Sequence, residues 1–316
     1  MSDSSVSTDV PADARSIVFS SYGEPEELRL AEAPVPSPGP GQVLLRVHAA
    51  GVNPVDWKIR AGLLKDFFPV SLPHVLGVEA AGVVVAVGEG VTARSVGDEV
   101  FGPVSGAYAE YALAGADRLG AKPADLDWGA ASGLHSSAET AYRTLELLKV
   151  TAGDTLLVHG AAGSVGGLVV QFAVAAGARV VATASEANHD YLRELGAVPV
   201  SYGEGVFDRI REAAPDGVDA ALDAVGGAVA GSVELLGGPE RVVSIVDPVE
   251  AESAGARFTG GGDADYTAQA LERALALHAA GTLRLPIRAT FPLAEAAEAH
   301  RLSARGHGRG KIVLIP

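Results

Sequence analysis

A glycine-rich segment between two apolar runs is the first feature of the sequence with the residue types for chemistry. Residues 158–172 read VHGAAGSVGGLVVQF, and Gly163, Ser164 and Val165 lie in a dinucleotide pattern G-x-G-x-x-G whose first glycine is here Ala161. In that pattern the N-terminus of a helix turns backbone N–H groups toward a pyrophosphate, and glycine lets the backbone approach it. A tight turn between a strand and a helix is the alternative interpretation.

The segments on either side support the dinucleotide interpretation. A strand is predicted over residues 155–159 before the glycines, a helix over 167–176 after them, and a second strand over 179–183. The motif requires this order of elements within one βαβ unit. The same alternation includes helices over 138–149 and 188–195, a strand over 199–202, and the apolar segments DAALDAV and RVVSIV. Strands that alternate with helices through short connections predict a parallel sheet covered on both faces.

The end of the second predicted strand indicates which dinucleotide would bind. A site for NAD usually carries Asp or Glu there, which binds the ribose 2′-hydroxyl. Here the strand ends in the letters TAS at Ser185, with Asn188 just beyond, and this small polar end leaves room for a 2′-phosphate. The pattern therefore favours NADPH. The next residue, Glu186, is acidic, and no Arg or Lys stands at this strand end. The candidates for a positive partner of the 2′-phosphate are therefore Arg309 and Lys311 of the C-terminal GRGK, unless that segment is only a solvated turn.

The N-terminal part of the chain has a different pattern. Short valine-rich runs such as QVLLRVHAAGV and EAAGVVVAVG are separated by turn segments such as PSPGPG and GEGVTARSVGD. Strands at this spacing predict a β-rich or barrel-like unit over residues 15–127. Residues 1–14 are polar and acidic and predict a disordered tail. A helix over 266–280 and the strand KIVLI close the chain.

Composition excludes several classes of function. The formal charge of −15 leaves no basic face to replace the counterions of a nucleic acid. Without cysteine, the chain forms no disulfide, thiolate nucleophile or cysteine-ligated zinc site. The segment MSDSSVSTDVPADA lacks the apolar core of a signal peptide, and the apolar stretch 168–184 is too broken to span a membrane. We therefore expect a cytoplasmic protein whose partners include neither nucleic acid nor membrane.

Five motifs together resemble the zinc-free quinone oxidoreductase family of the medium-chain dehydrogenase/reductase superfamily. They are GVNPVDWKIRAG (51–62), LGVEAAGVVVAVGEGV (76–91), GAAGSVG (160–166), LDAVGG (222–227) and GRGKIVL (308–314). The resemblance implies an α/β fold with a GroES-like β-rich catalytic domain over 15–127 and 262–316. It also implies a doubly wound parallel-sheet (Rossmann) domain that binds NADPH over 128–261, and a homodimer that pairs at the sheet edge near the VVSIV strand.

The same resemblance indicates whether the chain carries the zinc ligands of zinc-dependent family members. Zinc-dependent members carry Cys where this chain has Asn53, and His before the Glu of a G-H-E motif that here reads Gly77-Val78-Glu79. Valine cannot ligate zinc, asparagine is a poor ligand, and the four-cysteine lobe is missing. We therefore expect no metal site, and we expect His74 and Glu79 to be structural.

Without a metal, the chemistry that remains is hydride transfer from a reduced nicotinamide to an acceptor that is already activated. A quinone or an α,β-unsaturated carbonyl qualifies, because conjugation moves the incoming charge onto oxygen, where protein hydrogen bonds can stabilise it. Two alternatives stay open. One is a pathway-specific enoyl reductase acting on an acyl or polyketide-like substrate, and the other is a non-catalytic NADPH-binding protein.

The resemblance also implies roles for individual residues. Asn53 stands at the position of a zinc ligand and is the first candidate for a polar group at the nicotinamide and substrate. Asp56 and Lys58 follow on the same loop as further catalytic candidates; a helix cap is the alternative role of Asp56, and Lys58 replaces a residue that is often tyrosine. We expect the loop 247–255 to set substrate specificity. The remaining candidate cofactor contacts are Thr140, Tyr202, Ala224, Val225, Ile245 and Val246.

Overall fold

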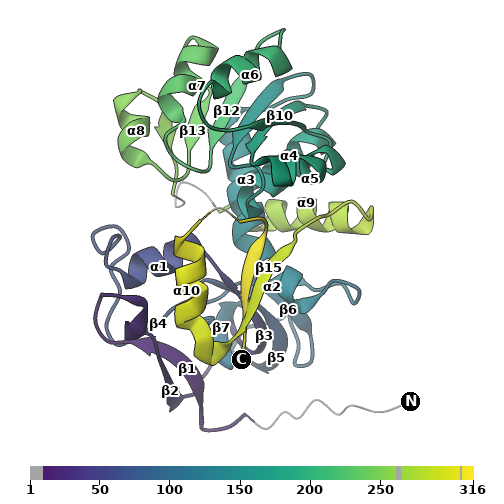
Figure 1. Cartoon of the computed structure of the whole chain (residues 1–316). Helices are drawn as coiled ribbons and strands as arrows, with labels where there is room; N and C mark the ends of the chain where they lie inside the picture. The colour runs from purple at the N-terminus through teal and green to yellow at the C-terminus, as the bar shows by residue number, and fades with distance from the viewer. Residues whose placement is uncertain (1–9, 261–264, 307) are drawn as a thin grey trace. The chain divides into compact units, whose positions relative to one another are not determined.

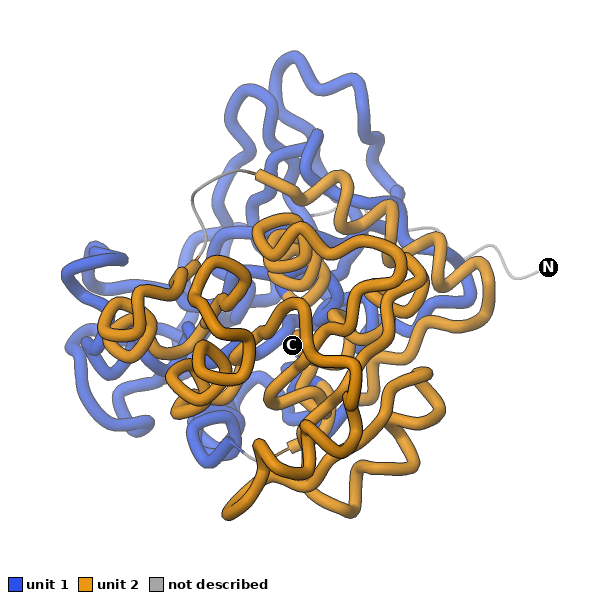
Figure 2. Tube along the Cα trace, turned by 90° about the horizontal axis from the view of Figure 1, so that it is seen from above, with its two compact units in different colours: residues 1–136, 287–307, 311–316 blue, residues 137–286, 308–310 orange. Residues whose placement is uncertain are grey.

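The computed structural model describes residues 10–260, 265–306 and 308–316. They form two compact units, which Figure 2 colours separately. The first unit contains the described residues up to 136, together with 287–306 and 311–316. The second contains the described residues of 137–286, together with 308–310.

The first unit is built from two β-sheets (Figure 1). The smaller sheet has the strand order β2-β1-β4, with β1 (Asp13–Phe19) antiparallel to β2 (Arg29–Pro34) and to β4 (His74–Val75). The larger has the order β15-β16-β3-β5-β6-β8, and β7 pairs with β3. Its strands are β3 (Gln42–Val52), β5 (Glu79–Val87), β6 (Glu99–Pro103), β7 (Tyr111–Gly115), β8 (Gly120–Ala121), β15 (Ile287–Pro292) and β16 (Lys311–Ile315).

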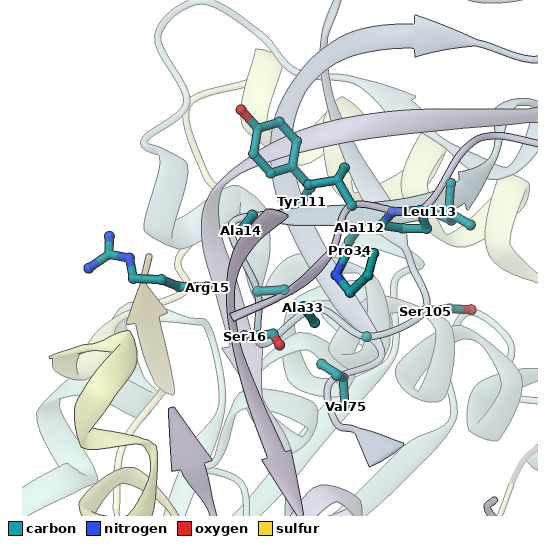
Figure 3. A pocket seen from close by; sticks show the side chains of 14 residues that line it. Ala14, Arg15, Ser16, Ala33, Pro34, Val75, Ser105, Tyr111, Ala112 and Leu113 are labelled. Atoms are coloured by element: carbon teal, nitrogen blue, oxygen red, sulfur yellow. The ribbon is translucent and has the colours of Figure 1, made fainter. Parts of the chain in front are cut away.

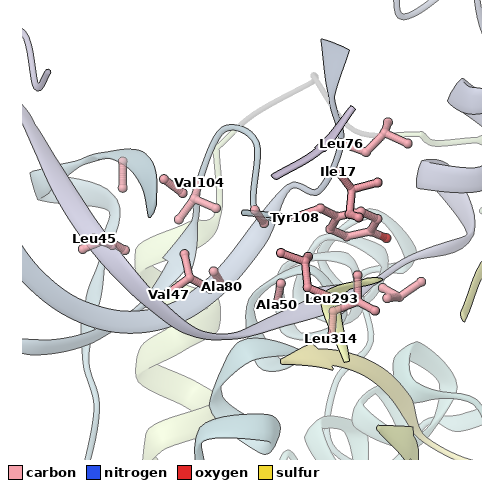
Figure 4. Packing of buried hydrophobic residues seen from close by; sticks show 14 of the residues in the cluster. Ile17, Leu45, Val47, Ala50, Leu76, Ala80, Val104, Tyr108, Leu293 and Leu314 are labelled. Carbon is pink, nitrogen blue, oxygen red and sulfur yellow. The ribbon is translucent and has the colours of Figure 1, made fainter. Parts of the chain in front are cut away.

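The hydrophobic core of the first unit collects side chains from elements far apart in the sequence. Ile17, Leu45 and Leu314 are at most 1% exposed and come from β1, β3 and β16 (Figure 4). Burying one such side chain stabilises the fold by roughly 1.5–3 kcal/mol. Tyr108 places its ring in the same core, fully buried. This packing fixes the strand ends that carry the polar residues described below.

The first helix of the first unit begins where the sequence provides a cap. The segment after Asn53, expected to be a loop, is the helix α1 (Pro54–Arg60), and that expectation is wrong. Proline occupies the first turn, and the carboxylate of Asp56 accepts the backbone N–H of Asn53 at 2.8 Å. This is the capping role that was the alternative for Asp56. The other helices are α2 (Trp128–Ser132), α10 (Ala296–Ala304) and the first residues of α3 (Leu134–Leu148).

The second unit is organised around a six-stranded parallel sheet with the order β11-β10-β9-β12-β13-β14. Counted from β9 this is the order 3-2-1-4-5-6 of a Rossmann sheet, in which ligands bind at the carboxyl ends beside the switch point. The switch point lies between β9 and β12. The strands are β9 (Thr155–His159), β10 (Arg179–Ala184), β11 (Val198–Ser201), β12 (Ala220–Asp223), β13 (Val242–Ser244) and β14 (Arg257–Phe258).

Helices connect these strands, and the sheet is buried beneath them, as expected for an α/β fold (Figure 1). Leu157, Val181 and Val242 are fully buried in the core of this unit. The helices are α4 (Ser164–Ala175), α5 (His189–Glu194), α6 (Val206–Ala213), α7 (Val229–Leu236), α8 (Pro248–Ser253) and α9 (Thr267–Ala279), with most of α3. Short 3-10 helices lie at Pro25–Glu27, Ala116–Arg118, Glu186–Asn188 and Leu293–Glu295.

The unit boundaries differ from the expected 127/128 and 261/262. Residues 128–136 belong to the first unit because α2 contacts β3 and β5. The described residues of 262–286 belong to the second unit, where Arg273 of α9 donates to the backbone oxygen of Phe172 at 2.8 Å. The tail prediction is also too long: β1 begins at Asp13, and residues 1–9 lie outside the described part.

Two further expectations about the second unit need correction. The segment 247–255 is not a loop, because Asp247 caps α8 by accepting the N–H of Glu250 at 2.9 Å and Pro248 begins the helix. The first three residues of the VVSIV segment form β13, which pairs on both sides, so the sheet edge near it is β14. No helix in the described ranges is both long and apolar enough to cross a membrane.

Candidate active site

The glycine turn, residues 160–166, connects β9 to α4 at the switch point of the parallel sheet. Gly160 has φ +75°, and a Cβ atom on Gly166 would lie 2.5 Å from the Gly160 carbonyl oxygen. Glycine is therefore required there for the close approach of helix and strand. Gly163 is the N-cap of α4, and no side chain caps this end of the helix. The N-terminal N–H groups at Ser164 and Val165 thus remain for an anion.

The segment after β12 packs directly on the glycine turn. A Cβ atom added to Gly160 would lie 3.2 Å from the backbone oxygen of Ala224 and from Cβ of Val225. The buried carboxylate of Asp223 holds this segment, since it accepts the N–H of Val225 at 3.1 Å and the N–H of Gly226 at 2.8 Å. Sequence reasoning missed Asp223, although an aspartate before small turn residues is a signal for such a loop.

The next two predicted contacts lie at the same edge of the sheet. Ile245 and Val246 follow β13 directly, and the Ile245 N–H donates to the backbone oxygen of Asp223 at 3.0 Å. Asp223 also accepts the hydroxyl of Ser244 at 2.8 Å, which ties the ends of β12 and β13 together. The structure thus places Ala224, Val225, Ile245 and Val246 at the carboxyl edge of the sheet, as predicted from the strand order, with Ala224 and Val225 beside the glycine turn.

The ends of β10 and β11 carry the residues predicted for a 2′-phosphate. Ser185 follows β10, and its hydroxyl accepts from Nδ2 of Asn188 at 2.9 Å. Tyr202 follows β11 and is 56% exposed. Beside it, Arg209 of α6 donates to the backbone oxygens of Ser201 at 2.9 Å and of Glu204 at 2.8 Å. Arg209 is a positive charge that sequence reasoning missed, because α6 itself was not predicted.

The two cations proposed for the phosphate, Arg309 and Lys311, have different surroundings in the structure. The N–H of Gly310 donates to the backbone oxygen of Ala162 at 3.2 Å, which places the 308–310 segment beside the glycine turn. Arg309 is exposed there, and its guanidinium lies 5.2 Å from the ring centroid of Tyr191. Arg309 therefore stays a candidate for phosphate binding.

Lys311 is wrong as a phosphate ligand. It begins β16 in the first unit and is 2% exposed, with Nζ 2.5 Å from Oε1 of Glu79 and 2.6 Å from Oδ1 of Asn53. The reason is that the chain passes from the second unit to the first between Gly310, whose φ is +81°, and Lys311, the first residue of β16. Asn53 completes the group by donating Nδ2–H to Oε1 of Glu79 at 2.8 Å. We call Asn53, Glu79 and Lys311 the ion-pair cluster.

The charge state of Glu79 follows from this arrangement. Glu79 is fully buried, and burial acts to raise its pKa, but the Lys311 ammonium and the nearby His135 outweigh this and hold the pKa below its usual range. The second carboxylate oxygen accepts the backbone N–H of Ser136 at 2.9 Å. Glu79 is therefore an anion paired with a cation inside the first unit, where the sequence analysis expected a structural pair with His74.

A second buried group consists of Asp56, Tyr108 and His300. The Asp56 carboxylate also accepts the hydroxyl of Tyr108 at 2.8 Å, and that hydroxyl lies 3.2 Å from Nε2 of His300. Burial raises the pKa of Asp56 to about 7 and lowers the pKa of His300 to about 3. His300 is thus neutral near pH 7, while Asp56 titrates there.

Two predicted residues stay outside these groups. Lys58 lies about 200° around α1 from Asp56 and therefore on another face, with Nζ 5.8 Å from the ring centroid of Trp57. A catalytic role of Lys58 stays a prediction. Thr140 lies in the part of α3 that belongs to the second unit, where its hydroxyl is 3.4 Å from Nη2 of Arg143.

Two further features of the described residues are the grouping of possible metal ligands and a pocket in the first unit. Among residues 10–260, 265–306 and 308–316, no three His, Asp or Glu side chains are grouped so that they could hold a metal ion. A pocket between β1, β2 and β7 contains none of the predicted site residues (Figure 3). Its lining includes Ala14, Ser16, Pro34, Val75, Tyr111 and Leu113.

Comparison with known proteins relates both units to described families. Residues 39–124 match the family model described as an alcohol dehydrogenase GroES-like domain, and residues 195–314 match the model described as a zinc-binding dehydrogenase. The chain is 34% identical to a quinone oxidoreductase of Sus scrofa, over 93% of this chain and 95% of that one. It is 32% identical to a chloroplastic NADPH-dependent alkenal/one oxidoreductase of Arabidopsis thaliana, over 97% and 81% of the two chains. A solved structure of a mycobacterial protein complexed with NADPH is 32% identical and superimposes with a TM-score of 0.82, covering 96% of this chain and 100% of the other.

Proposed function

Since this chain belongs to the quinone oxidoreductase type of the medium-chain dehydrogenase/reductase superfamily, we propose that it reduces quinones or α,β-unsaturated carbonyls with NADPH and without a metal ion. The observation that carries the proposal is the glycine turn. It leaves the N-terminus of α4 without a side-chain cap at the switch point and has the exposed Arg309 beside it. The names of the similar quinone and alkenal oxidoreductases support the acceptor class.

The residues of the second unit fit a phosphorylated dinucleotide. The N–H groups of Ser164 and Val165 would hold the pyrophosphate at the positive end of the α4 dipole, and Arg309 is the candidate cation for the 2′-phosphate. Ser185 and Asn188 offer small polar groups for the 2′-phosphate, and no acidic side chain occupies the end of β10 at residues 184–185. Bound NADPH supplies a hydride from its nicotinamide, and the protein orients it and excludes competing reactions.

In the first unit, Asn53 is the proposed contact with the acceptor oxygen. Hydride addition to a conjugated acceptor develops negative charge on that oxygen, and a positioned N–H donor stabilises it. A metal ion does not fit this position, because the ammonium of Lys311 already lies 2.6 Å from Asn53 and 2.5 Å from Glu79. Val78, beside Glu79, has no donor atom for a metal. The donor set therefore supports a mechanism that uses no Lewis acid.

The experiment is a fluorescence titration with NADPH and NADH, followed by turnover assays after dialysis against EDTA. We expect NADPH to bind about tenfold more tightly, which corresponds to about 1.4 kcal/mol. The acceptor panel is 1,4-benzoquinone, 9,10-phenanthrenequinone and a series of 2-alkenals. Binding of NADPH without turnover of any acceptor would favour a non-catalytic binding protein, and activity restored only by zinc would contradict the proposal.

A homodimer is part of the same proposal. The edge of the parallel sheet at β14 is two residues long and has Phe258 38% exposed, and an unpaired strand edge is a natural surface for pairing with a second copy. Light scattering at micromolar concentration is expected to give twice the monomer mass of 32.0 kDa. A mass equal to that of the monomer would contradict this part.

A further inference from the structure

The amide of Asn53 is held in one orientation by two opposite charges. Its Oδ1 accepts from the Lys311 ammonium at 2.6 Å, and its Nδ2 donates to the Glu79 carboxylate at 2.8 Å. Rotating the amide by 180° would place its oxygen against the carboxylate and its N–H groups against the ammonium. Both contacts would be repulsive, because a carboxylate only accepts and an ammonium only donates. The ion pair therefore determines which way the amide faces.

The amide nitrogen has a second N–H. An asparagine amide carries two N–H donors, and the contact with Glu79 uses one of them. The other has no acceptor among the residues that the structure describes. Asn53 itself keeps 8% of its surface exposed. The arrangement thus leaves one oriented donor on a side chain whose other polar contacts are satisfied.

The fold makes room for the ion pair at two glycines. A Cβ atom on Gly51 would lie 2.7 Å from Oε1 of Glu79, and a Cβ atom on Gly133 would lie 2.4 Å from Cγ of Lys311. Both charged side chains are almost completely buried, at 0% and 2% exposure. Burying an ion pair costs desolvation free energy that an apolar pair would avoid. Stability alone is therefore a weak reason for charges at this place.

From this geometry we infer that Glu79 and Lys311 are positioning residues, which orient and polarise Asn53 so that its second N–H binds the oxygen of the acceptor. The inference rests on the proposed function. The Lys311 ammonium, which donates to Oδ1, withdraws electron density from the amide and strengthens its remaining N–H as a donor. When a hydride from NADPH forms the new C–H bond, the π electrons of the acceptor move to its oxygen. Asn53 stabilises that oxygen until water supplies the proton.

A double-mutant cycle tests whether the pair acts through Asn53. The substitutions Glu79→Gln and Lys311→Met are made together, because removing one partner would leave an unpaired buried charge. We expect kcat to fall about 10²-fold in Asn53→Ala, as for other single oxyanion donors. The Glu79→Gln/Lys311→Met variant is expected to lose about tenfold or more. Combining all three substitutions is expected to cost no more than Asn53→Ala alone. Losses that multiply would show that the pair acts independently of Asn53 and would overturn the inference.

A matched control separates positioning from the general effect of removing a buried lysine. Lys122 is 9% exposed, and its Nζ lies 3.0 Å from Oε2 of Glu99, away from Asn53. Glu99→Gln/Lys122→Met is expected to leave kcat within about twofold of wild type. An equal loss of kcat in this control would contradict a specific role for the ion-pair cluster.

Two further measurements keep the test decisive. Lys311→Arg keeps a cation and is expected to retain at least about a tenth of the wild-type kcat, while Asn53→Leu, which leaves both charges in place, loses about 10²-fold. A loss in Lys311→Arg as large as in Asn53→Leu counts against the inference.

Titration with NADPH is expected to give unchanged affinity in every variant. If the wild type binds no NADPH or reduces no acceptor, the proposed function fails and the inference fails with it; multiplicative losses in an active enzyme refute the inference alone.

Discussion

The glycine turn of the second unit and the ion-pair cluster of the first unit prepare for charge in opposite ways. The glycine turn uses backbone N–H groups at the end of α4, close to one another in the sequence and not capped by a side chain. The ion-pair cluster uses buried side chains from positions 53, 79 and 311, in which the charges of Glu79 and Lys311 already neutralise each other. The first arrangement suits a ligand that brings its own negative charge. The second suits a reaction in which charge appears only on an oxygen as the hydride arrives.

The largest expected effect concerns a single buried charge of the ion-pair cluster, compared with a lysine elsewhere in the first unit. Lys311→Met leaves the carboxylate of Glu79 unpaired, which is expected to lower the free energy of unfolding by about 3–5 kcal/mol. Lys122→Met removes a lysine from Glu99, whose side chain is 48% exposed, and is expected to cost about 1 kcal/mol. Urea unfolding of both variants measures the contrast. Equal losses of unfolding free energy in the two variants would mean that Glu79 depends on its lysine no more than Glu99 does.

Asp56 is expected to make stability depend on pH. Its pKa is raised to about 7 from 3.8, so the native state holds a proton that the unfolded state releases between those values. The stabilisation is full below about pH 4 and is lost as the pH rises through about 7. The buried histidines act in the opposite direction at acidic pH, because burial lowers the pKa of His159 to about 4 and of His300 to about 3.

Comparison of the wild type with Asp56→Asn isolates the aspartate from those histidines. Relative to Asp56→Asn, the wild type is expected to lose on the order of 2–4 kcal/mol of unfolding free energy between pH 4 and pH 8. Denaturant titrations at intervals across this range provide the measurement. A difference that stays constant with pH would show that burial does not shift the titration of Asp56.

Substitution by alanine is expected to destabilise the protein much more at Gly166 than at Gly163 of the glycine turn. A Cβ atom on Gly166 would lie 2.5 Å from a backbone oxygen, and Gly166→Ala is therefore expected to destabilise the protein by about 1–3 kcal/mol and to weaken NADPH binding. A Cβ atom on Gly163 would meet only one atom, at 3.4 Å, so Gly163→Ala is expected to leave the melting temperature nearly unchanged. Thermal unfolding ranks the two variants, and a reversed order would contradict the packing described here.

The smallest expected effect is a change of cofactor preference. Ser185→Asp places a carboxylate at the end of β10, which is expected to repel a 2′-phosphate and to weaken NADPH binding about tenfold while NADH binding is kept or improved. Glu186→Gln changes the exposed neighbouring residue and is expected to alter the affinity less than about threefold. Fluorescence titration measures both variants. An unchanged NADPH affinity in Ser185→Asp would move the phosphate site away from Ser185.

Local signals in the sequence were sufficient where one element carries its own pattern. Apolar runs and glycines predicted β9 at 155–159, the turn after it and α4 within three residues of its start. The alternation of strands and helices predicted the parallel sheet and hence the edge where Ala224, Val225, Ile245 and Val246 lie. Asn53 and Asp247 each stand before a proline, which is a helix-start signal, and both segments expected to be loops are helices in the structure.

By itself, then, the sequence determined the fold class, the glycine turn and the short polar end of β10, because each depends on neighbours a few residues away. Only the tertiary structure decided that Arg309 faces solvent beside the glycine turn while Lys311, two residues on, is buried with Glu79. The same holds for the pairing of Asp56 with Tyr108 and His300, which lie 52 and 192 residues apart from their hydrogen-bond partners in the chain. The physical reason is that strand pairing and core packing, rather than chain proximity, bring these charges together, and burial then sets their ionisation.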